Sequence, residues 1–177
     1  MIKRIPILLL LLAAIPVYAQ DKKPTSLRDV LLAELQTTHD NEDWFVPANI
    51  AVKGLTAEQA SWTDGKGNHS VGQLAYHILY WNRRNLARLK GEQLDKFSGN
   101  NEETFDKFDS KSWNETVQQL DNVMKELEKW VEAADEAKLK ENAQVFTHIS
   151  THNAYHIGQI IYIRKLQGSW DPANGVK

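Results

Sequence analysis

Apolar residues recur every three or four positions in four stretches of the chain, which is the repeat expected of amphipathic helices. The last stretch has the most regular stripe, made of Val145, Ile149, His152, His156, Ile160, Ile163 and Leu166. No segment alternates apolar and polar residues convincingly enough to indicate a β-strand. Four long helices without strands predict an all-α protein, a four-helix bundle.

Start and stop signals set the expected limits of these helices. Ser26 can cap the first helix, and Pro47 ends it. Ser70 with Gln73, and Ser112 with Glu115, have the spacing of capping boxes at the starts of the second and third helices. The helices are expected at residues 26–46, 70–90, 112–134 and 143–167.

The chain begins with the pattern of a secretory signal peptide. Lys3 and Arg4 precede an uncharged apolar run over residues 5–15, and small residues then favour cleavage after Ala19. The run is shorter than the roughly 20 apolar residues that span a bilayer, so no stable membrane span is expected after cleavage. An uncleaved N-terminal anchor is the alternative.

This pattern sets the expected domain organisation and location. Residues 1–19 form the signal peptide, residues 20–25 a polar linker, and residues 26–177 one bundle domain. The protein is expected to be exported, with the periplasm as its compartment.

Composition narrows the chemistry. The chain has no cysteine, which excludes disulfides, Cys-ligated zinc, iron–sulfur clusters and thiol catalysis. A net charge of −2 gives no indication of nucleic acid as a partner. The H-E-x-x-H motif of zinc peptidases and Gly-rich phosphate-binding loops are both missing. Six histidines are the one compositional indication of a site, and a small molecule is the expected ligand or substrate.

Two histidines occupy core positions in the last stripe. His152 and His156 lie about 6 Å apart along a helix axis, so both can direct a nitrogen at one metal ion. The alternative is that each is a hydrogen-bonded core residue, because H-x-x-x-H is a loose pattern. His148 continues the row near the edge of the stripe.

The other helices add weaker candidates. His77 lies beside the main apolar face of the second helix, where spacing alone favours a packing role. Glu42 falls at an apparent core position of the first helix, and His39 lies at the edge of that stripe. Glu42 is interpreted as a fourth ligand, a general base or a solvated residue at the bundle end. The third helix, without an ionisable group in its stripe, is expected only to pack, and the acidic segment 101–109 to be a solvated loop.

Two histidine-containing motifs lie in the second and last predicted helices. Residues 70–77 read SVGQLAYH, and residues 152–159 read HNAYHIGQ. They resemble the second-helix motif and the last-helix signature H-x-x-x-H-x-G-Q of the DinB/YfiT-like superfamily. The resemblance implies a four-helix bundle in which three histidines hold a divalent metal ion, commonly zinc or nickel. Carried over by position, the ligands are His77, His152 and His156. Members often dimerise, so a homodimer is also implied.

The resemblance also implies a range of activities. The superfamily includes thiol transferases that use low-molecular-weight thiols and proteins described as metal-dependent hydrolases. Export, and Ile157 where many members have Arg, both count against a thiol transferase. We therefore expect an exported metal-dependent hydrolase or transferase, with Glu42, Tyr155 or His39 as the proton-transfer group. A bundle that binds a metal or small ligand without turnover, and one whose histidines only form internal hydrogen bonds, are the alternatives.

Overall fold

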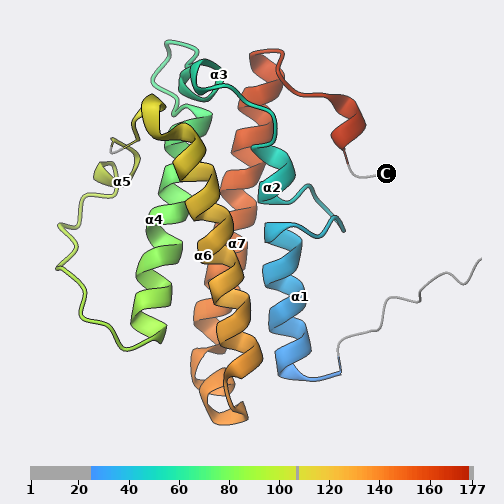
Figure 1. The fold of residues 1–177 in the computed structure, drawn as a ribbon, viewed down its shortest axis with the longest axis vertical. Helices are drawn as coiled ribbons and strands as arrows, with labels where there is room; N and C mark the ends of the chain where they lie inside the picture. The colour runs from blue at the N-terminus through green and yellow to red at the C-terminus, as the bar shows by residue number, and fades with distance from the viewer. Residues whose placement is uncertain (1–24, 107, 176–177) are drawn as a thin grey trace, which may run out of the picture.

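The computed structural model describes residues 25–106 and 108–175, which are helical and contain no strand. The four longest helices are α1 (Leu27–His39), α4 (Val71–Leu89), α6 (Trp113–Ala133) and α7 (Glu136–Leu166). Helices α1 and α4 each pack against both α6 and α7 (Figure 1). The prediction of an all-α bundle is confirmed.

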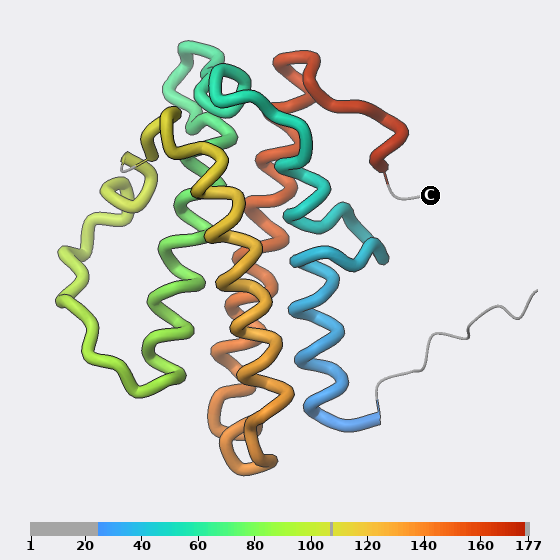
Figure 2. The backbone as a smooth tube through the Cα atoms, viewed as in Figure 1, coloured from blue at the N-terminus to red at the C-terminus, as the bar shows by residue number. Residues whose placement is uncertain are grey.

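The connections between the long helices differ in length. A tight turn joins α6 to α7, whereas a long connection returns from the end of α4 along the outside of the bundle to the start of α6 (Figure 2). This returning connection contains α5 (Glu103–Asp106) and the 3₁₀ helix η1 (Ser110–Ser112), and α5 packs against α4. The short helices α2 (Ala48–Ala51) and α3 (Ala57–Ser61) lie between α1 and α4, and η2 (Pro172–Asn174) follows α7.

The predicted C-terminal end of the first helix is wrong. Helix α1 stops at His39 instead of continuing to Val46. The next four residues, Asp40 to Asp43, are all polar and exposed, so a further turn would have no apolar side chain to bury. The chain then enters α2 directly after Pro47, which is its N-cap residue and has an extended backbone.

The starts of the other long helices depend on which side chain caps the helix N-terminus. Ser70 and Gln73 form the expected capping box of α4. Ser112 makes no capping bond at α6, because its backbone lacks the extended conformation of a capping residue. Asp109 instead caps η1, where it accepts the backbone N–H of Lys111. Helix α7 begins at Glu136, seven residues before the expected start, because Asp135 caps it.

Apolar side chains from the long helices fill the bundle interior. Buried examples are Leu35, Ile78, Leu120, Leu127, Ile149 and Ile160. No described helix combines the length and apolar character needed to cross a membrane. The expected signal peptide, residues 1–19, lies outside the described residues, as does the expected linker except for Thr25.

Candidate metal centre

Three histidines meet where α4 packs against α7. His77 comes from α4, and His152 and His156 come from consecutive turns of α7. One ring nitrogen of each lies within 4.8 Å of the other two, and the Nε2 atoms of His77 and His152 are 3.0 Å apart. His77 is only 2% exposed. The structure therefore brings together the three residues that the family resemblance selects.

Hydrogen bonds from outside the group orient two of the imidazoles. The Nδ1 atom of His77 lies 2.5 Å from Thr104 Oγ1, and that hydroxyl donates to the backbone oxygen of Asn101 at 2.6 Å. Because its proton is already used, Thr104 accepts the Nδ1–H of His77. The Nδ1–H of His156 similarly donates to the side-chain oxygen of Gln159 at 2.6 Å. Both rings therefore have an Nε2 lone pair free to bind a metal ion.

Burial keeps the three imidazoles neutral. Burial, reinforced by the neighbouring histidines His156, His152 and His69, lowers the pKa of His77 to about 3. Burial and the nearby His156 lower the pKa of His152 to about 4. The pKa of His156 is also lowered, chiefly by burial. Neutral imidazole is the form that binds a cation, so the group needs no deprotonation near neutral pH.

These residues fit a divalent metal ion. Two imidazole nitrogens bound tetrahedrally at about 2.1 Å from one ion lie about 3.4 Å apart. The 3.0 Å between the Nε2 atoms of His77 and His152 is close to that value. Three imidazoles leave coordination positions for water or substrate, as in catalytic zinc sites.

A cavity of about 620 Å³ opens beside the three histidines. Tyr155, a predicted proton-transfer candidate, lines it and is largely exposed. His148 also lines it, exposed at the edge of the helix stripe as expected. The candidate site is thus open to a small molecule.

The returning connection supplies site residues that the sequence analysis missed. Phe105 stacks between the rings of His69 and His77, 3.9 Å from each by ring centroid. His69, which comes just before α4 in the chain, also lines the cavity, and its Nε2 atom lies 3.6 Å from an oxygen of Glu102 in the returning connection. The interpretation of residues 101–109 as a solvated loop is wrong for Thr104 and Phe105, which are buried. The signal was an apolar Phe and a Thr within an acidic segment.

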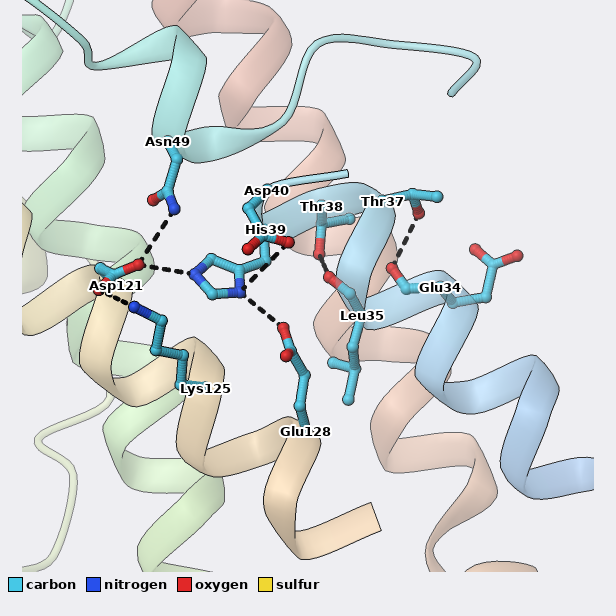
Figure 3. A network of polar contacts seen from close by, with 10 residues as sticks. All are labelled: Glu34, Leu35, Thr37, Thr38, His39, Asp40, Asn49, Asp121, Lys125 and Glu128. Carbon is cyan, nitrogen blue, oxygen red and sulfur yellow. Dashed lines mark hydrogen bonds and ion pairs between the residues drawn. The ribbon is translucent and has the colours of Figure 1, made fainter. Parts of the chain in front are cut away.

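The two candidates from the first helix do not join this group. Glu42 is exposed in the loop after α1, as the interpretation of a solvated residue requires, and it is not part of the three-histidine group. His39 is 1% exposed and lies instead between α1 and α6 (Figure 3). Its Nδ1 is 2.6 Å from Glu128 Oε1, and its Nε2 is 2.9 Å from Asp121 Oδ1.

This second set of contacts, which we call the His39 network, corrects the view of α6 as a packing helix only. Asp121 also accepts hydrogen bonds from Asn49 at 3.0 Å and Lys125 at 2.7 Å (Figure 3). Burial by itself lowers the pKa of His39, but the hydrogen bonds to Glu128 and Asp121 outweigh it, so the pKa is raised. With both ring nitrogens facing carboxylates, the imidazolium is the form that satisfies every contact.

Comparison with known proteins identifies the family of this chain. The family model of the DinB superfamily matches residues 48–160, a segment that contains all three histidines of the candidate metal centre. Comparisons with curated proteins and with solved structures found no match. The match extends over more than half of the chain and agrees with the helical bundle described above. The chain therefore belongs to the DinB superfamily.

Proposed function

We propose that this protein binds one divalent metal ion through His77, His152 and His156 and acts as an exported metal-dependent hydrolase or transferase. The observation that carries the proposal is the convergence of three neutral imidazoles at the wall of an open cavity. Zinc or nickel is the proposed ion, because imidazole ligands suit both. Export is proposed from the pattern of residues 1–19, and a homodimer from the family resemblance.

The residues around the site support such chemistry. A bound ion would polarise a substrate carbonyl or phosphoryl oxygen and lower the pKa of bound water toward about 7. Thr104 and Gln159 hold two of the ligands in the required tautomer. Tyr155 and His69 line the same cavity and can hold or transfer a proton there.

Metal analysis of the purified protein tests the site. We expect about one equivalent of bound ion in the wild-type protein, as one set of ligands requires, and loss of the ion in His152→Ala and His156→Ala. His148→Ala is the matched control, because His148 lines the cavity from the same helix but lies outside the three-histidine group. A His152→Ala protein that keeps its full metal content would contradict the assignment.

Turnover is tested separately from binding. The metal-loaded protein should cleave an activated ester, 4-nitrophenyl acetate, faster than the metal-free protein and faster than His152→Ala. Equal rates in all three samples would reduce the proposal to a protein that binds metal without hydrolytic activity.

A further inference from the structure

A second cavity adjoins the one at the three histidines. Its volume is about 270 Å³, and it lies between the α3–α4 connection and the C-terminal part of α7. Three residues, His69, Leu74 and Gln159, line both cavities. The two cavities are therefore adjacent, with the three histidines in the first, and together we call them the cleft.

The second cavity gathers exposed apolar side chains. Trp62, Tyr162 and Leu166 line it, with 36%, 63% and 50% of their surfaces exposed. Four other large apolar side chains are exposed among the described residues, and one of these, Tyr155, lines the first cavity. Large apolar side chains exposed around a concave surface are typical of a ligand site.

Charge limits what this cleft can hold. Among the described residues that line either cavity, none is Lys or Arg, and the acidic ones are Asp64 and Glu102. Asp64 already accepts hydrogen bonds from the Asn68 side chain and the Lys66 backbone. A phosphate or carboxylate group on a ligand would therefore meet no Lys or Arg side chain in the cleft.

We infer that the ligand of the three-histidine site has a polar, metal-binding head and an uncharged apolar or aromatic tail that lies against Trp62, Tyr162 and Leu166. The volume of the second cavity equals that of about nine liquid waters, which is room for a phenyl ring or a short alkyl chain. The head position rests on the proposed function, whereas the tail position rests on the second cavity alone.

A pair of hydroxamates tests the tail on the metal-loaded protein. Acetohydroxamate and octanohydroxamate share a metal-binding head and differ only in alkyl length. Partial burial of the longer chain should make octanohydroxamate bind about tenfold more tightly or better, measured by calorimetry. In the double variant Tyr162→Ala/Leu166→Ala, the ratio of the two affinities should fall toward one. Leu94→Ala removes an exposed leucine outside this cleft and should leave the ratio unchanged.

The outcomes separate the tail from the metal site. Equal affinities for the two hydroxamates, or a ratio that survives in the double variant, would overturn the inference. If the protein binds no metal, the proposed function fails, and 4-phenyl-1-butanol is then titrated into the metal-free protein. A saturable NMR shift of the Trp62 indole N–H would still support the apolar subsite, and no shift would overturn it.

A second copy of the chain is the rival occupant of this face. Light scattering of the wild-type protein and the double variant decides between them. A wild-type dimer that becomes a monomer in Tyr162→Ala/Leu166→Ala would make the face a subunit contact and overturn the ligand inference. An unchanged mass, together with the changed affinity ratio, supports it.

Discussion

Replacing His39 with leucine should destabilise the fold, and more strongly at pH 6 than at pH 9. His39 is buried, and both of its ring nitrogens face carboxylates from α6, those of Glu128 and Asp121. Asp40 also faces the ring, with its oxygen 3.9 Å from Nδ1, and Lys125 bonds the far oxygen of Asp121. The substitution removes the shared partner of two carboxylates.

The size of the effect follows from these contacts. A hydrogen bond to a charged group contributes about 1.5–3 kcal/mol, so two of them give about 3–6 kcal/mol. Both carboxylates are only partly buried, and Asp121 keeps its bonds with Asn49 and Lys125. Because solvent and these partners compensate in part, we expect a loss near the lower end, about 3 kcal/mol at pH 6.

The pH dependence has a definite sign. The pKa of His39 is raised in the folded state, so the folded protein binds this proton more tightly than the unfolded chain does. The resulting stability is fully present below about pH 6.5, the ordinary pKa of histidine, and is lost as the pH rises through the folded-state value. Each unit by which the pKa is raised corresponds to about 1.4 kcal/mol.

Urea unfolding of the wild-type protein and His39→Leu at pH 6, 7.5 and 9 measures the effect. The difference in the free energy of unfolding should shrink toward pH 9 while the urea dependence stays the same. Glu128→Gln is the control, because its amide can still bond His39 but carries no charge, and it should weaken the pH dependence. An equal difference between wild type and His39→Leu at pH 6 and pH 9 would refute the reasoning.

Three further predictions concern the candidate metal centre and the packing of the returning connection against α4. Thr104→Val removes the acceptor of the His77 Nδ1–H and should weaken metal binding about 10–100-fold in a chelator competition; an unchanged dissociation constant would contradict this. The metal-free protein should lose stability toward urea as the pH falls below about 6.5. The pKa values of His77 and His152, about 3 and 4, lie below the unfolded value, so the unfolded chain binds more protons in this range. A free energy of unfolding that stays constant from pH 7 to pH 5 would count against this prediction. In Gly72→Ala the new Cβ would clash with the Phe108 ring, so the ring must move, and thermal unfolding should reveal a loss of about 1–3 kcal/mol; an unchanged midpoint would contradict this.

Helical periodicity predicted the burial of the candidate ligands of α7 better than that of the candidate ligand of α4. His156 lies in a single regular stripe, and the structure buries it. His77 lies beside the main stripe of α4, yet it is more deeply buried than His156. The reason is that α4 packs against α5 as well as against α6 and α7, so more than one of its faces is covered. A projection of one helix contains no information about a connection that folds back over it.

The predictions for the first helix, its C-terminal end and the role of His39, were wrong for two different reasons. The spacing of its apolar residues continues to Val46, but the polar residues from Asp40 to Asp43 end α1 at His39. The partners of His39 come from α6, 82 and 89 positions further along the chain. Contacts at that separation depend on which helices pack together, and the periodicity of either helix alone does not specify this.

The origin of Thr104 and Phe105 links the proposed metal centre to a part of the chain outside the long helices. Both belong to the connection between α4 and α6, and both contact His77, one by a hydrogen bond and one by stacking. Binding equilibria that share a contact are coupled equally in both directions. An ion held by His77 would therefore fasten this connection to α4, and any change that detaches the connection would cost metal affinity by the same free energy. Metal binding could then be detected away from the ion, as increased protection of this connection from proteolysis or hydrogen exchange.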